Sequence, residues 1–172
     1  MLYLIPRYAD QTKSGIDLCL RSRLVVPAIT LLYSGIDVLG FLASAKPHAT
    51  RQTFILWAEK HLDCFLKTKG ICGLDLYSAR CGLLHTGQAP SAHVDSGDAR
   101  ELWYRFDGEA HINMMTNTPK PAVLVDVEEL VESFKGGIER LMSDVEADPN
   151  LRTEAERKAE RYFRTGILIG PR

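Results

Sequence analysis

The apolar stretch from Ser14 to Ala45 constrains the fold of this chain more than any other feature. It is rich in Leu, Ile, Val and Ala, and its large apolar residues recur at largely helical spacing. Pro27 has no backbone N–H and clashes with the preceding turn, so it should kink this segment or start a second helix. Asp37 is the one charged residue inside the run from Leu31 to Leu42. A buried helix carrying one carboxylate is therefore expected.

The rest of the chain also favours helices. Amphipathic or charged patterns predict them over residues 50–67, 73–86, 126–147 and 151–163. Thr50 and Asp126 are suitable N-caps for two of these, and Gly87 is a suitable residue just beyond the end of another. Residues 88–99 have the composition of a loop.

One segment departs from the helical pattern. Alternating apolar residues at 102–106 and 110–114 flank Asp107-Gly108, a typical signal for a type I′ hairpin turn. Residues 123–125 should form an edge strand. The aromatic residues of the first strand are expected to pack in the core rather than to stack on bases.

The sequence thus predicts a mainly α fold, a helical bundle with a small β-hairpin insertion. A single domain is expected over residues 14–165 of the 172. Residues 1–13 are expected to form an irregular arm, and residues 166–172 a C-terminal tail.

Composition limits the classes of function. A net charge of −1 argues against a nucleic-acid coat protein, although a nuclease needs only a local basic patch. The four cysteines form no C-x-x-C pair. The longest apolar stretch, Leu24 to Ala45, is broken by Pro27 and carries Asp37, so no membrane span is expected. These features favour a cytoplasmic protein.

Arg80 occupies an unusual position on the helix predicted over residues 73–86. At about 100° per residue, Leu76, Tyr77 and Leu84 all fall within about 60° of it, so Arg80 is centred on the apolar stripe. An unpaired charge there would cost several kcal/mol, of order 3–5 when a partner is removed. Asp37 is the expected partner, as a second charge in an apolar helical run. A structural ion pair and a substrate-binding arginine are compatible interpretations.

His85 lies about 140° from Arg80 on the same wheel, at the end of the helix. The helix dipole there favours the protonated imidazole, so a capping or solvated role is one interpretation. Cys81 and His85 are four residues apart and share a face, which would suit half a zinc site or a Cys–His nucleophile pair. Zinc would need Cys64 or Cys72 as further ligands. Cys81 is otherwise a small core residue.

The segment Tyr77-Ser78-Ala79-Arg80-Cys81-Gly82-Leu83-Leu84-His85-Thr86-Gly87 resembles the signature helix of the HEPN superfamily, whose motif is an arginine followed by a histidine after four to six residues. Upstream, residues 32–39 resemble the long first helix of bacterial HEPN-like proteins of unassigned function. The resemblance covers residues 14–147, with its specific part at Asp37 and residues 77–87.

The resemblance implies a helical bundle and a homodimer in which two motif helices form one composite cleft. It implies metal-independent endoribonuclease activity in many members, whereas others are binding or scaffold modules. By position, Arg80 and His85 match the motif pair. Cys81 is a departure, because active members often have Asn, Asp or His directly after the arginine.

Two functions are therefore carried forward. One is a metal-independent endoribonuclease with Arg80 and His85 as catalytic residues and Asp37, Tyr77 and Cys81 as supporting residues. The other is a non-catalytic module that dimerises and binds RNA or nucleotide. No cofactor or metal ion is expected in either case, and the sequence identifies no partner antitoxin.

Overall fold

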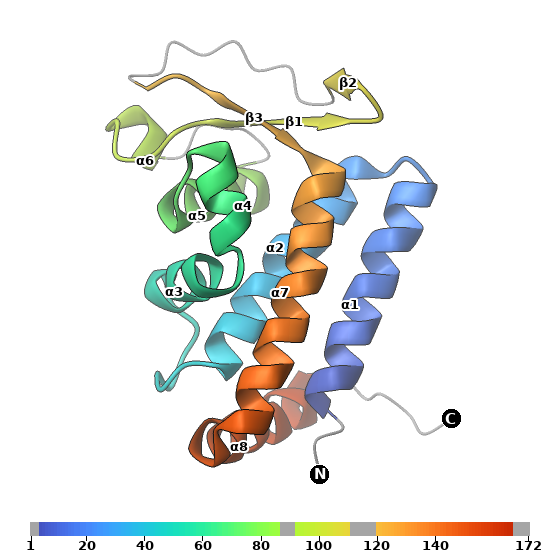
Figure 1. Cartoon of the computed structure of the whole chain (residues 1–172), viewed down its shortest axis with the longest axis vertical. Coiled ribbons are helices and arrows are strands. Elements are labelled where there is room, and N and C mark those ends of the chain that lie inside the picture. The colour runs from blue at the N-terminus through green and yellow to red at the C-terminus, as the bar shows by residue number, and fades with distance from the viewer. Residues whose placement is uncertain (1–3, 87–91, 111–119, 167–172) are drawn as a thin grey trace.

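A central helix, α2 (Val25–Leu42), organises the fold. The computed structural model of the protein describes residues 4–86, 92–110 and 120–166. As Figure 1 shows, α2 runs through the bundle, and the helices that pack against it are α1 (Leu4–Arg21), α3 (Arg51–His61), α7 (Val127–Ala147) and α8 (Pro149–Gly166). The expected fold class, a mainly α bundle with a small β insertion, is confirmed.

The apolar character of α2 is explained by its packing. Among the described helices it is the one long and apolar enough to cross a membrane, yet 56% of that 18-residue window is buried inside the protein. Its buried residues include Leu32, Tyr33, Ile36 and Leu39, each 0% exposed. The helix is thus the centre of the hydrophobic core, whose burial is the main favourable contribution to folding.

The N-terminal segment differs from the expectation. Residues 4–13 are not an irregular arm but the first half of α1, so that prediction is wrong. The buried residues of α1 are Ile5, Ala9, Thr12 and Ile16, which recur at the spacing of one helical face. Pro6 is compatible with this helix because it is the third residue, where a backbone N–H would have no partner within the helix.

Two helices replace the single segment expected over residues 14–45. The chain reverses at Arg23, which adopts a left-handed conformation with φ 57°, and α2 begins at Val25. Pro27 is the third residue of α2, so the second of its two expected effects, the start of a new helix, is the one observed.

The helix expected over residues 50–67 is also divided. Thr50 caps α3 as expected, and its side chain accepts a hydrogen bond from the Thr53 N–H. The helix then ends at His61, and α4 (Asp63–Lys69) follows. Arg140 on α7 donates two hydrogen bonds to the His61 carbonyl. In a continuous helix this carbonyl would instead accept a hydrogen bond from the backbone N–H four residues later.

The β segment forms a three-stranded sheet at the end of the bundle where α7 begins (Figure 1). Its strand order is β2 (Glu109–Ala110), β1 (Leu102–Phe106) and β3 (Val123–Asp126), with β2 antiparallel and β3 parallel to β1. Asp107 and Gly108 have φ values of 52° and 76°, as a type I′ turn requires. The hairpin and the edge strand are confirmed, while residues 111–114 lie outside the described residues.

The sheet is fastened to the central helix through its inward side chains. Leu102, Tyr104 and Phe106 are buried, which confirms that Tyr104 and Phe106 belong to the core. Trp103, the third aromatic residue of the strand, is only half-buried and lies outside the core. The hydroxyl of Tyr104 forms a buried hydrogen bond with the hydroxyl of Tyr33 on α2. The sheet therefore closes the core at one end of the bundle.

The remaining elements fit the expectation with small changes. A short helix, α6 (Ala92–Asp95), lies within the segment expected to be a loop. Asp126 caps α7, accepting hydrogen bonds from the N–H groups of Glu128 and Glu129. The last helix, α8, is longer than expected, and residues 167–172 of the expected tail lie outside the described residues.

Gly40 provides a test of the packing between α2 and α3. A Cβ at this position would lie 2.6 Å from the backbone oxygen of Thr53, which cannot move without shifting α3. Gly40→Ala should therefore lower the free energy of unfolding by about 1–3 kcal/mol. The measurement is urea unfolding followed by circular dichroism.

Gly136→Ala on α7 is the matched control. Its Cβ would meet only the guanidinium of Arg140, at 3.4 Å, which is an ordinary van der Waals contact. Because alanine loses less conformational freedom in a helix than glycine, this variant should gain roughly 0.5–1 kcal/mol. Equal stabilities for the two variants would contradict the close approach of α2 and α3.

Candidate functional site

An ion pair joins the two charges that the sequence places on apolar helix faces. Nε and Nη2 of Arg80 each lie 2.8 Å from Oδ2 of Asp37. Arg80 belongs to α5 (Gly73–Cys81), and Asp37 belongs to α2. The side chains are 19% and 20% exposed, so both charges are largely withdrawn from water yet accessible from one side. The expected pairing is confirmed.

Burial and charge act in opposite directions on Arg80. Burial disfavours the charged guanidinium, but the Asp37 carboxylate beside it more than compensates, and the net effect raises the pKa of Arg80 above its ordinary value. The guanidinium therefore stays charged at neutral pH. It can serve as a permanent cation in the site.

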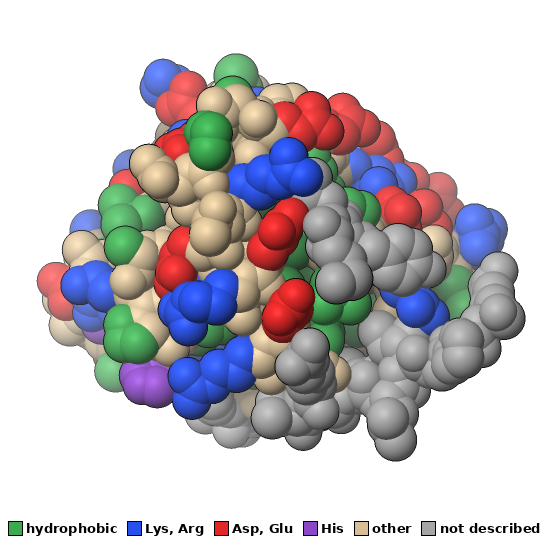
Figure 2. Space-filling view, turned by 90° about the horizontal axis from the view of Figure 1, so that it is seen from below, with side chains coloured by type: hydrophobic (Ala, Val, Ile, Leu, Met, Phe, Trp, Pro, Cys, Tyr) green, Lys and Arg blue, Asp and Glu red, His purple; other side chains and the backbone are tan. Residues whose placement is uncertain are grey.

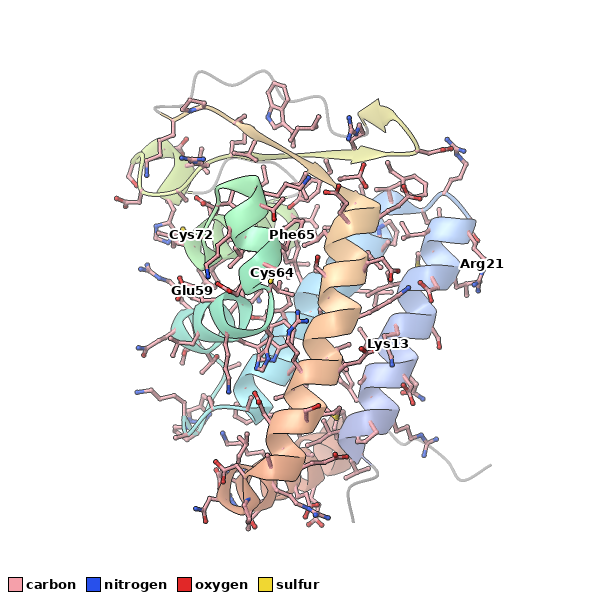
Figure 3. All side chains as sticks on the ribbon, viewed as in Figure 1. Lys13, Arg21, Glu59, Cys64, Phe65 and Cys72 are labelled. Carbon is pink, nitrogen blue, oxygen red and sulfur yellow. The ribbon has the colours of Figure 1, made fainter. Side chains whose placement is uncertain are left out.

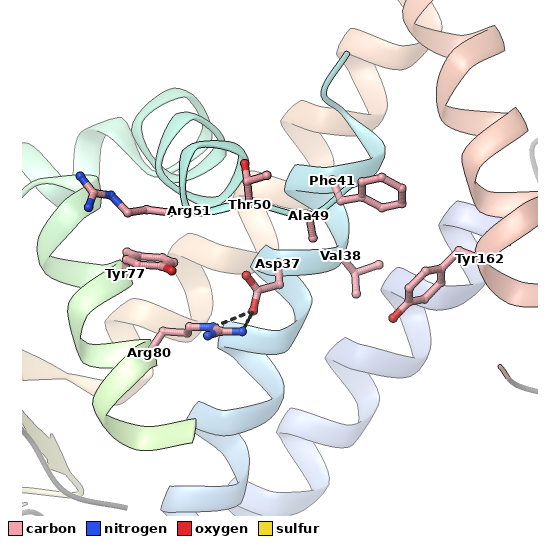
Figure 4. Close-up of a pocket in the computed structure, with 9 residues that line it drawn as sticks. All are labelled: Asp37, Val38, Phe41, Ala49, Thr50, Arg51, Tyr77, Arg80 and Tyr162. Carbon is pink, nitrogen blue, oxygen red and sulfur yellow. Dashed lines mark hydrogen bonds and ion pairs between the residues drawn. The ribbon is translucent and has the colours of Figure 1, made fainter. Parts of the chain in front are cut away.

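The ion pair forms one wall of an open pocket of about 240 Å³. Figure 4 shows the residues around it: Asp37, Val38 and Phe41 from α2, Ala49, Thr50 and Arg51 at the start of α3, Tyr77 and Arg80 from α5, and Tyr162 from α8. Arg51 extends away from the ion pair, and its guanidinium lies 3.4 Å from His93. Residues from four helices thus line one pocket.

The start of α5 is fixed by a buried carboxylate. Asp75 is 4% exposed and accepts hydrogen bonds from the backbone N–H groups of Cys72, at 2.8 Å, and Arg100, at 2.6 Å. An acidic residue is favourable in the first turn of a helix. The anchoring of α5 at its first turn sets the position of Arg80 in its last turn.

The helix changes its winding directly after the arginine. Residues Gly82–Thr86 form a π-helical turn, labelled η1, in place of the regular helix expected to residue 86. Its hydrogen bonds span five residues, so each residue rotates less about the axis than in an α-helix. Positions 80 and 85 are therefore separated by less than the expected 140°. The backbone of His85 lies in this turn, and its side chain lies outside the described part of the structure.

Tyr77 and Cys81 flank the arginine. The Tyr77 ring packs edge-on against Phe54, with ring centroids 5.6 Å apart. Burial, and then a hydrogen bond with Cys81, raise the pKa of the Tyr77 hydroxyl, which therefore stays protonated near neutral pH. Cys81 is half-buried. The supporting role expected of both residues stays a prediction.

The zinc alternative fails on geometry for Cys72 and Cys81 as joint ligands. Cys72 precedes the first residue of α5 and Cys81 ends it, so about 13 Å of helix separates them at 1.5 Å per residue. Figure 3 shows Cys64 on α4 and Cys72 in the segment that leads into α5. Within the described residues, no group of three His, Cys, Asp or Glu side chains is placed to hold a metal ion.

Comparison of the chain with protein-family models, with curated proteins and with solved structures finds no match. The resemblance to HEPN proteins accordingly stays a prediction. What supports a function is the geometry of the pocket.

Six residues of the pocket were not identified as site residues from the sequence: Val38, Phe41, Ala49, Thr50, Arg51 and Tyr162. Phe41 follows Asp37 by four residues, so helical spacing alone would place it on the same face. Arg51 follows the Thr50 cap directly. No local signal marks Tyr162, which reaches the site only because α8 packs on α2.

Replacing Asp37 tests the ion pair. Asp37→Ala would leave the largely buried Arg80 guanidinium without its carboxylate. We expect a loss of about 1.5–3 kcal/mol in unfolding free energy, as for a hydrogen bond to a charged group. Thermal and urea unfolding measure it.

Glu132→Ala is the surface control. Glu132 pairs with Lys135, but its side chain is 70% exposed, so its loss should cost at most about 1 kcal/mol. The double variant Asp37→Ala/Arg80→Ala should be more stable than the sum of the two single losses predicts. Additive losses would mean that the two side chains do not stabilise one another.

Proposed function

We propose that the pocket binds an RNA phosphodiester and that the protein is a metal-independent endoribonuclease of the HEPN type. The observation that carries this proposal is the Arg80 guanidinium, held on Asp37 at 2.8 Å in the wall of an open pocket. Arginine binds phosphate oxygens through a planar set of donors. Asp37 orients this group before substrate arrives, which reduces the entropy lost on binding.

The proposed chemistry needs one cation and proton transfer. The ribose 2′-oxygen attacks the neighbouring phosphorus, and the bond from phosphorus to the 5′-oxygen breaks. His85 accepts the proton of the 2′-hydroxyl or donates one to the leaving 5′-oxygen. Arg80 stabilises the charge that develops on the phosphorane oxygens. The products are a 2′,3′-cyclic phosphate and a free 5′-hydroxyl, and DNA, which has no 2′-hydroxyl, is not cleaved by this route.

The π-turn supports a role for His85. Such turns are rare and occur often at functional sites. This one begins two residues after Arg80 and includes His85. It reduces the angular separation of the two positions, which a regular helix would have kept on different faces.

A second candidate is a module that binds RNA or nucleotide without cleaving it. The observation in its favour is the same ion pair, because Asp37 already offsets part of the positive charge that a transition state would need. Cys81, where active HEPN proteins often have Asn, Asp or His, favours it as well. This candidate predicts binding without turnover.

The proposal includes a homodimer. Three leucines in α1, in α2 and between these two helices are exposed. Leu18 on α1 is 59% exposed, Leu24 just before α2 is 51% exposed, and Leu31 on α2 is 37% exposed. Leu31 packs against α1, since its Cδ1 lies 3.3 Å from the position that a Cβ on Gly15 would take. Val38, which lines the pocket, is seven residues from Leu31 and so shares its face of α2. A second copy covering this face would border the pocket.

RNA cleavage is the test of the enzyme. Purified protein should cleave labelled single-stranded RNA in EDTA and leave 2′,3′-cyclic phosphate ends or their hydrolysis product. Arg80→Ala and His85→Ala should both remove the activity. Loss of the arginine should raise the barrier by roughly 2.7–4 kcal/mol, a factor of about 10²–10³ in rate.

The controls separate chemistry from folding. In Asp37→Asn/Arg80→Gln both charges are removed, so no buried charge is left alone, and this variant should be inactive with a nearly normal unfolding midpoint. Arg152→Gln, an exposed arginine on α8, should keep full activity. Cleavage that persists in His85→Ala would end the enzyme proposal, and binding without cleavage by the wild type would select the second candidate.

Dimerisation is tested separately. The wild type should sediment as a dimer at tens of micromolar, and Leu31→Glu should convert it to a monomer by placing a charge in the interface. Leu56→Glu, at an exposed position on α3, should remain dimeric. A wild type that sediments as a monomer would contradict the dimer and the composite cleft.

A further inference from the structure

A second pocket adjoins the first at the C-terminal end of α2. Its volume is about 200 Å³, and it is lined by Phe41, Pro47, His48, Arg157, Lys158, Arg161 and Tyr162. Phe41 and Tyr162 line both pockets, so their rings stand between the two cavities. Their centroids are 6.4 Å apart.

A short backbone segment also connects the two pockets. Pro47 and His48 line the second pocket, and the next three residues, Ala49 to Arg51, line the first. Three residues of extended chain span at most roughly 11 Å. The two cavities are therefore within reach of a few successive nucleotides.

The charge of this surface differs from that of the whole protein. The chain has 21 Lys and Arg against 22 Asp and Glu, whereas the two pockets together are lined by five Lys and Arg, one His and a single carboxylate, Asp37. Figure 2 views the molecule from the α8 end and shows lysine and arginine side chains next to a histidine at one edge of that face. Local positive charge of this kind attracts a polyanion even when the net charge is near zero.

The basic side chains of the second pocket differ in their exposure and in their partners. Lys158 is 3% exposed, and its ammonium group donates to the carbonyls of Phe41 and Ser44, so it holds the end of α2 and cannot reach a ligand. Arg157 is exposed and engages Glu154 at 2.7 and 2.9 Å. Arg161 and His48 are exposed. Arg161 lines the pocket and directly precedes Tyr162 in the chain, so we take it as the main cation of this pocket.

Tyr162 adds a surface for stacking. Its side chain is 43% exposed and lies beside the Phe41 ring, as Figure 4 shows. Exposed aromatic rings next to basic side chains are the usual means by which proteins bind single-stranded nucleic acid, because every base can stack.

From this arrangement we propose that the second pocket is a phosphate subsite for single-stranded RNA, in which Arg161 binds a backbone phosphate and a neighbouring base stacks on Tyr162. The inference rests on the proposed function, since it assigns the path of the strand that reaches Arg80. The strand would cross from one pocket to the other over Tyr162 and Phe41.

The test is binding of a short labelled strand, measured by fluorescence anisotropy over a series of salt concentrations. Single-stranded DNA of the same base sequence serves as the probe that cannot be cleaved. Arg161→Gln should weaken binding and reduce the slope of log affinity against log salt by about 0.7, the value for one phosphate contact on a single strand. Tyr162→Ala should weaken binding roughly fivefold or more, while Tyr162→Phe, which keeps the ring, should bind like the wild type.

Arg152→Gln is the matched control, because Arg152 is an exposed arginine of the same helix that lines neither pocket. It should leave the affinity and the slope unchanged. Unfolding midpoints confirm that every variant is folded. Equal behaviour of Arg161→Gln and Arg152→Gln would overturn the subsite.

The experiments distinguish failure of the proposed subsite from failure of the proposed nuclease activity. A reduced slope in Arg161→Gln, together with RNA that the wild type leaves intact, supports the subsite and contradicts cleavage. Cleavage by the wild type with an unchanged slope in Arg161→Gln supports the nuclease and overturns the subsite. A wild type that binds neither RNA nor DNA overturns both.

Discussion

The carboxylate of Asp37 on the central helix imposes the constraint around which the site is built. α2 is covered by α1, α3, α7 and α8, and a carboxylate on such a helix is costly unless a cation meets it. Arg80 meets this requirement from α5. This ion pair both connects α5 to α2 and fixes the guanidinium in the pocket wall. The stability of the fold and the proposed binding therefore depend on the same two side chains.

Local chemistry made much of the fold predictable. The caps Thr50 and Asp126 and the turn Asp107-Gly108 are set by interactions within a few residues, and the structure contains all three. Tertiary contacts explain the errors. Pro6 is tolerated in the first turn of α1, and the sequence alone does not show that the helix starts there. The break after α3 lies at His61, whose carbonyl is bound by Arg140, nearly 80 positions later in the chain.

The candidate site was predictable only where it follows from a charge on an apolar face. Asp37 and Arg80 could be paired because each was alone among apolar neighbours, so each needed the other. The π-turn after Arg80 has no sequence signal that we can identify. Tyr162 could not be placed either, because the docking of α8 on α2 depends on the assembled bundle. The second pocket was missed for the same reason.

The central claim is that Arg80 and Asp37 present a guanidinium to a phosphate. The most direct measurement is the ¹⁵N spectrum of the arginine Nε–H groups, with the Arg80 signal assigned from Arg80→Lys, during titration with single-stranded DNA as the analogue that is not cleaved. The account predicts a saturable shift of the Arg80 Nε–H signal and no change for Arg152 on the far part of α8. An Arg80 signal that stays in place while the strand binds would contradict it.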